Sequence, residues 1–370
     1  MQEKNARMYE LEFPAPEVSL KDSEGPTLIV ALQGYADAGH AIDASAEHLL
    51  AALDHRPVAS FNNDELIDYR SRRPSVTIEH NNIVSAEELA LGIEVLRDNS
   101  GTPFLLLSGP EPDLRWDAFT KAVADLVERF GVSRTICLYA APMAAPHTRP
   151  MVVSAHGNSA DLIDHHFSLD TKITVPGSAS LQLERLLNKQ GRNVAGYTAH
   201  VPHYLSASPY PQATLSLLEA VSSSTGLKFP LRTLEEDSRK VALQIEEQVA
   251  SSAEIENVVR LLEQQYDEEL ERYREANPEA VMPGESAVPN AELLGEEFEK
   301  FLADIDNRSL NGGKARTIKT PQLPQTTLTS QMGKRSSNVK NSPTGEGMNT
   351  LFPPRFVMSY SYSPHFPFCS

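Results

Sequence analysis

"TLIVALQGYADAGHAIDASAEHLLAAL", residues 27–53, is the stretch that decides the fold. An unbroken apolar run of strand length leads into a turn at Gly34, and apolar residues then recur at helical spacing from Ala41 to Ala52. A continuous apolar strand is typical of a strand that is buried on both faces of a sheet. The stretch therefore predicts a strand, turn and helix of an α/β protein.

The same alternation continues outward from this unit to Gly226. "NSG" at 99–101 predicts a hairpin turn, and Asp113 is expected to cap the helix that Gly131 ends. Further strands are expected at 56–61, 75–80, 91–98, 102–109, 135–140, 149–157, 172–177 and 193–201, and helices at 113–131, 178–191 and 211–226. This order predicts a mostly parallel sheet that is covered by helices on both faces.

The composition changes after the α/β region. Residues 234–277 are rich in Glu, Gln and Leu at helical spacing, and a shorter helix is expected at 290–305. We expect these helices to form a hairpin whose apolar stripe packs on the parent domain, with another subunit as the alternative. Residues 307–370 are rich in Ser, Thr, Asn and Pro, which predicts a disordered tail.

Charge and cysteine content exclude several classes of function. The net charge is -17, although residues 307–370 hold eight basic residues and one acid, so the rest of the chain carries about -24. Such an acidic body would repel nucleic acid and anionic lipid. Cys137 and Cys369 are the two cysteines, which gives neither a disulfide framework nor a zinc pattern. With no membrane-length apolar run and no signal-peptide layout at the start, we expect a cytoplasmic protein.

Histidines are concentrated between His147 and His166, which raises the question of a metal site. Asp161 and His165 are four residues apart, but no metal-binding frame accompanies them. His147 and His156 would lie at opposite ends of a strand, too far apart to share an ion. We therefore expect no metal and no cofactor.

The residues raise two further chemistries, nucleophilic catalysis and phosphate binding. Ser108 and Ser154 are possible nucleophiles, yet neither lies in a GxSxG elbow; triads form in space, so the option stays open. Gly34 and Gly39 follow a strand as phosphate-binding glycines do, but their spacing fits no phosphate motif. Asp37 between them is expected to be a turn residue or helix cap.

Five motifs in order along the chain resemble those of the PAC2 family, the proteasome assembly chaperone 2-like proteins, and more narrowly its actinobacterial branch. The motifs are "GYADAG" at 34–39, "GPEPDLRW" at 109–116, "PHTRP" at 146–150, "VPGSASLQLERLL" at 175–187 and "VPHYLSASPYPQA" at 201–213. The resemblance extends from Met8 to Ile305. It implies a three-layer α/β/α domain of the phosphorylase/hydrolase-like type, a small helical C-terminal subdomain and homo-oligomers, with a trimer as one option.

The resemblance also shapes the expected function and domain limits. Relatives are linked to proteasome assembly through α-type subunits, so we expect a non-catalytic binding or assembly factor. A hydrolase or phosphorylase-like enzyme and an oligomeric scaffold that docks through its helices are the alternatives. The expected domains are 8–228 (α/β), 229–306 (helical) and 307–370 (tail).

The loops at the carboxyl ends of the strands are the expected binding site, because such loops form the functional crevice of an open α/β sheet. Arg149 is expected to hold an anion or a partner's carboxylate, or to lock the loops by pairing with Asp37 or Asp113, and the lock is favoured. The residues assigned to the site are Gly34, Asp37, Gly39, His147, Arg149, His203 and Tyr204.

Overall fold

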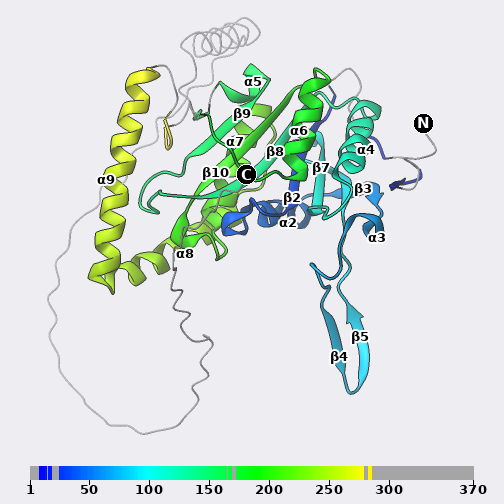
Figure 1. Cartoon of the computed structure of the whole chain (residues 1–370), viewed down its shortest axis with the longest axis horizontal. Coiled ribbons are helices and arrows are strands. Elements are labelled where there is room, and N and C mark those ends of the chain that lie inside the picture. The colour runs from blue at the N-terminus through cyan, green and yellow to red at the C-terminus, as the bar shows by residue number, and fades with distance from the viewer. Residues whose placement is uncertain are drawn as a thin grey trace, which may run out of the picture. The chain divides into compact units, whose positions relative to one another are not determined.

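An eight-stranded sheet forms the centre of the protein, and a two-stranded hairpin stands apart from it (Figure 1). The computed structural model describes residues 8–14, 16–18, 25–164, 166–168, 172–278 and 282–285. The strands are β1 (Tyr9–Leu11), β2 (Thr27–Gln33), β3 (His55–Phe61), β4 (Val76–Glu79), β5 (Asn82–Ala86), β6 (Gly92–Arg97), β7 (Pro103–Pro110), β8 (Arg134–Met143), β9 (Val153–Gly157) and β10 (Val194–Pro202).

The strand order is β1-β3-β6-β7-β2-β8-β10-β9. The four central strands β7, β2, β8 and β10 are parallel, as predicted, whereas the outer strands pair antiparallel. The sheet is thus mixed, with a parallel centre. The short turn at 99–101 makes β6 and β7 an antiparallel hairpin, and β9 runs antiparallel beside β10.

Helices cover both faces of the sheet, which confirms the three-layer α/β/α architecture. Cores on the two faces are separate: one holds α2 and α7 side chains such as Leu49 and Leu217, and the other holds α4 and α6 side chains such as Phe119 and Leu183. None of the described helices is long and apolar enough to cross a membrane. The helices are α2 (Ala41–Ala52), α3 (Asn63–Leu66), α4 (Trp116–Arg129), α5 (Ala160–Ile163), α6 (Ala179–Lys189), α7 (Pro211–Thr225), α8 (Arg232–Ala250) and α9 (Ala253–Ala276), with 3-10 turns η1 (Ala38–His40) and η2 (His203–Leu205).

Two local predictions were wrong. The apolar residues of 172–177 form no strand; Ile173 and Val175 are more than half exposed, because the segment pairs with no neighbouring strand. Asp113 does not cap the helix: α4 begins at Trp116, and the Asp113 carboxylate instead accepts the backbone N–H of Asp68 and pairs with Arg72. The local sequence pattern identifies apolar and polar residues. It does not show whether a strand has a neighbour to pair with, or which backbone group a carboxylate binds.

The hairpin of β4 and β5 projects from the body at the lower right of Figure 1. The sequence predicted β4 but missed β5 and the hairpin. Every residue of both strands is exposed, among them several large apolar ones: Val76, Ile78, Ile83 and Val84. Exposed apolar residues concentrated on a two-stranded ribbon are unusual for an isolated soluble chain.

The helical stretch expected at 234–277 consists of two helices. α8 begins two residues before the predicted stretch, and α9 follows it after Ser252, whose side chain accepts the N–H of Ile255 and caps α9. They meet at a corner rather than lying side by side (Figure 1). α8 packs on α7 of its own chain through Leu234 and Ile245, in agreement with the expected packing on the parent domain. The shorter helix expected at 290–305 and the tail at 307–370 lie outside the described residues.

Candidate functional site

Loops from the carboxyl ends of the central strands meet at one edge of the sheet, as the topology predicted. The Gly39 N–H donates to Ser206 O (2.8 Å), and the Tyr210 N–H donates to Gly39 O (2.9 Å), which joins the loops after β2 and β10. The Ala140 N–H donates to Ala36 O (2.8 Å), which brings in the end of β8. The candidate residues therefore belong to one connected set of loops.

Gly34 has a packing role in this set. A Cβ atom at this position would lie 2.3 Å from Oε2 of Glu111, which follows β7. Glu111 is buried and accepts the backbone N–H of Ala179 at the start of α6 (2.6 Å). Burial raises the pKa of this carboxyl, and the hydrogen bond from Ala179 opposes the rise. Gly34 thus leaves room for a carboxylate that ties the loop after β7 to α6.

Asp37 is a helix cap, as the residue pattern indicated. Its Oδ1 accepts the N–H of Ile42 in the first turn of α2 (2.7 Å), where the helix dipole favours a negative charge. Burial raises the pKa of the Asp37 carboxyl, while the Ile42 hydrogen bond lowers it. Gly39 has φ +69°, a backbone conformation that favours glycine. Both residues shape the turn.

His147, His203 and Tyr204 come together where the loops after β8 and β10 meet. The Tyr204 hydroxyl accepts the backbone N–H of His147 (2.9 Å) and lies 2.7 Å from its Nδ1. The ring of His203 stands edge-on to Tyr204, with ring centroids 5.3 Å apart. Burial lowers the pKa of His147, so its imidazole is mainly neutral at pH 7. His147 and Tyr204 can therefore exchange hydrogen bonds without carrying charge.

Arg149 does lock the loop, but with partners other than those predicted. Its guanidinium binds both carboxylate oxygens of Asp267 (2.8 Å each) and Oε1 of Glu263 (3.1 Å), both on α9. Asp37 and Asp113 are engaged elsewhere. The hydrogen bonds from Arg149 lower the pKa of Asp267. The sequence analysis expected Arg149 to pair with a carboxylate of another loop. The ion pair instead joins the loop after β8 to α9.

Two neighbouring residues reinforce the same junction. The Thr148 hydroxyl donates to Oε1 of Glu263 (2.5 Å), and the Tyr266 hydroxyl donates to the carbonyl of Pro150 (2.7 Å). We call Thr148, Arg149, Glu263, Tyr266 and Asp267 the α9 clamp. Sequence reasoning missed its α9 half. The available signal was a pair of carboxylates four residues apart on either side of a buried tyrosine, which places all three on one helix face.

Two polar pairs outside the loops were also missed. Ser154 Oγ lies 2.8 Å from Nε2 of His200, and His156 Nε2 lies 3.0 Å from Oε2 of Glu184. In the part of the chain that the structure describes, no three His, Cys, Asp or Glu side chains converge as metal ligands would. Asp161 and His165 were the best-spaced candidate metal ligands in the sequence, and His165 lies outside the described residues.

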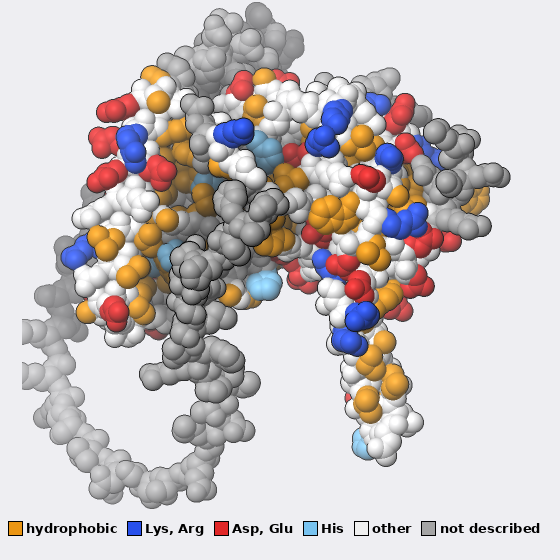
Figure 2. Space-filling model, in the orientation of Figure 1, with side chains coloured by type: hydrophobic (Ala, Val, Ile, Leu, Met, Phe, Trp, Pro, Cys, Tyr) orange, Lys and Arg blue, Asp and Glu red, His pale blue; other side chains and the backbone are white. Residues whose placement is uncertain are grey.

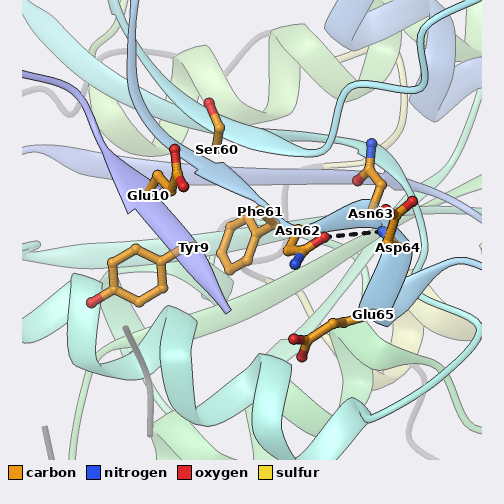
Figure 3. A pocket seen from close by; sticks show the side chains of 8 residues that line it. All are labelled: Tyr9, Glu10, Ser60, Phe61, Asn62, Asn63, Asp64 and Glu65. Carbon is orange, nitrogen blue, oxygen red and sulfur yellow. Dashed lines mark hydrogen bonds between the residues drawn. The ribbon is translucent and has the colours of Figure 1, made fainter. Parts of the chain in front are cut away.

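A hollow of about 580 Å³ lies between β1, β3 and α3 (Figure 3). None of the seven predicted site residues lines it. Asp64 accepts the Tyr69 hydroxyl (2.9 Å) and Glu65 pairs with Arg115, so two of its acids are already bound. Its lining residues are Tyr9, Glu10, Ser60, Phe61, Asn62, Asn63, Asp64 and Glu65. The hollow is acidic and separate from the loop cluster.

Comparison with known proteins places these features in a family. The sequence profile of the PAC2 family matches residues 31–249. A solved protein of unknown function from Corynebacterium glutamicum is 66% identical, with 72% of this chain and 100% of that chain covered and a TM-score of 0.71. A Mycobacterium tuberculosis protein of unknown function is 50% identical (72% and 92% covered, TM-score 0.69).

A more distant similarity carries a functional name. A structure described as a Mycobacterium tuberculosis proteasome-assembly chaperone homologue is 25% identical, with 63% of this chain and 99% of that chain covered and a TM-score of 0.58. The chain matches no curated protein.

Proposed function

The chain belongs to the PAC2 family, and from this premise we propose that it is a non-catalytic binding or assembly factor. The observation that carries the proposal is that the loop residues are engaged within the chain. Gly34 accommodates Glu111, Asp37 caps α2, and Arg149 holds α9. Loops occupied in this way support the fold and leave the outer surface of the helices to meet a partner.

α8 and α9 offer the surface for that partner. α9 contains eight acidic and three basic residues, and Figure 2 shows acidic side chains along it at the left of the molecule. Large apolar side chains are exposed on the same two helices: Leu243, Ile255, Val258 and Leu261. Apolar residues within a charged surface are typical of a protein interface.

We take α-type proteasome subunits as the partner, by extension from the chaperone homologue. The proposal includes a cytoplasmic location, an α/β domain at 8–228, a helical subdomain at 229–306 and a basic tail at 307–370. It assigns no cofactor, nucleic acid or membrane role.

Self-association is the second part of the proposal. The β4–β5 hairpin exposes Ile78 and Ile83 by 66% and 72%, and a second copy of the chain would bury them. Such an arm supports a homo-oligomer, with a trimer as one option. The alternative is a hydrolase or phosphorylase-like enzyme. It would use His147, His203 and Tyr204, because the side chains of these three candidate residues contact one another.

Affinity capture from the host's lysate tests the proposed function. The full chain should enrich α-type proteasome subunits over a tagged control, and Leu261→Glu should remove that enrichment, because a charge would enter the apolar surface. Lys121→Glu on α4 is the matched control and should bind as the wild type does. Recovery of the protein alone, with no α-type subunit, would refute the assembly role.

A further inference from the structure

The β4–β5 hairpin is an arm with one apolar face. In its register Ile78 lies opposite Ile83 and Val76 lies opposite Ala86, and alternate residues along a strand point to the same face. The other face is polar and holds Thr77, Glu79, Asn82 and Ser85. Every residue of the two strands is exposed, and Figure 2 shows hydrophobic side chains along the projecting arm. No described part of the chain therefore covers the apolar face of the arm.

Three of the five PAC2 motifs each expose one large apolar side chain at the carboxyl edge of the sheet. We call these side chains the crest: Tyr35 (75% exposed), Leu114 (50%) and Val175 (54%). Glu111 ties their loops together, because its N–H donates to Gln33 O (2.7 Å) and its carboxylate accepts the N–H of Ala179 (2.6 Å). Each crest residue lies within four positions of one of these three residues along the chain, so the crest belongs to one group of loops.

The arm joins the body beside the crest. Arg72, at the base of the arm, donates to Gln33 O (3.1 Å) and pairs with Asp113 (3.3 Å), the residue before Leu114. The arm and the crest are therefore neighbouring parts of the same edge. Residues 68–87 contain three arginines and three acids, so the arm and its base are close to neutral, although the whole chain carries a charge of -17.

We propose that the arm of one copy lies on the crest of a second copy, an inference that rests on the self-association proposed above. Two copies of a chain with a charge of -17 repel each other, so a contact between them requires surfaces with little net charge. The neutral arm and the apolar crest meet this requirement. The carboxyl edge of each copy is then completed by residues of its neighbour.

The size of the arm favours the crest over a second arm as its contact surface. The arm has four strand residues in β4 and five in β5, whereas a stable interface uses about 20–30 residues a side. Contact between two arms alone is therefore too small, and the crest supplies further apolar area. Because arm and crest are different surfaces, a single contact leaves one arm and one crest free, and a ring such as a trimer satisfies both.

Disulfide trapping tests this contact in the full chain. Cys369→Ser leaves the buried Cys137 as the remaining native cysteine. In that background, Ile78→Cys together with Leu114→Cys should give covalent oligomers when oxidised glutathione is added. The two positions cannot bond within one chain, because Ile78 lies about 20 Å beyond Arg72 along the extended arm and a disulfide requires Cα atoms within about 7 Å of each other.

Ile78→Cys together with Leu243→Cys, an exposed position on α8, is the matched control and should give no cross-link. Covalent dimers from Ile78→Cys alone would overturn the proposal, because the arms would then meet each other. A double variant that has the mass of an oligomer in light scattering but does not cross-link would overturn it as well and would leave self-association standing. A wild-type chain with the mass of a monomer would instead refute self-association itself, and the arm contact with it.

Discussion

At the scale of single residues, Arg149 gives the sharpest prediction. Arg149→Ala removes three charge-assisted hydrogen bonds to α9, so amide hydrogen exchange in α9 should accelerate, while exchange in α2 and the melting temperature should change little. The ion pair is partly exposed, which is why we expect local opening rather than global unfolding. Arg260→Ala, on α9 but outside the clamp, is the control. Equal exchange in the two variants would contradict the clamp.

A substitution at Gly34 tests whether this glycine is needed for packing against Glu111 rather than for binding a partner. Gly34→Ala would place a Cβ atom 2.3 Å from the Glu111 carboxylate, so urea unfolding should show a loss of about 1–3 kcal/mol. Gly177→Ala is a suitable control, because its nearest neighbour would be 3.9 Å away. An unchanged free energy of unfolding in Gly34→Ala would show that Glu111 is not packed as described.

His156 predicts a pH dependence of stability. The hydrogen bond to Glu184 raises the pKa of His156 above its ordinary value, despite opposing burial, and Tyr139 also faces the Glu184 carboxylate. An unfolded histidine has a pKa of about 6.5, so the protonated pair stabilises the fold fully below that pH. The stabilisation is lost as the pH rises through the folded-state pKa.

Urea unfolding of the wild type and His156→Gln measures this effect. The difference in unfolding free energy should be larger at pH 6 than at pH 8.5. A difference that is the same at both values would mean that His156 gains no proton affinity from Glu184.

At the scale of elements, the β4–β5 hairpin tests self-association. Ile78→Asp together with Ile83→Lys, two positions that face each other across the hairpin, should lower the mass measured by light scattering to that of a monomer, because charges would enter the proposed contact between copies. The melting point of the monomer should not fall, since both side chains are exposed. Val84→Thr, a milder change on the same strand, is the comparison. An unaltered mass in the double variant would remove the hairpin from any interface.

Sequence pattern predicted the buried elements well and the exposed ones poorly. β2 was predictable because each of its first six residues is buried, which leaves a continuous apolar run. Residues 172–177 have a similar apolar pattern but no strand partner, and β5 is wholly exposed, so its sequence has little burial signal. The α9 clamp joins residues more than a hundred positions apart, and the choice among possible acidic partners of Arg149 depends on three-dimensional packing.

At the scale of the whole molecule, the sheet positions the loops and the loops hold the helical region. The "PHTRP" loop leaves the end of β8, at the centre of the sheet, and grips α9 through Arg149 and Thr148. α8 is anchored separately through its contacts with α7. The outer surface of these helices, which is acidic and exposes several apolar side chains, is therefore held in place by contacts of both α8 and α9.

Hydrogen exchange of the full chain, alone and in complex with captured α-type subunits, tests the central claim most directly. Our account predicts protection in α8 and α9 around Leu243, Val258 and Leu261, with no change in the loop at 34–40. Protection confined to the loops at 34–40 and 203–205, with α8 and α9 unchanged, would contradict it and would place binding in the loop crevice instead.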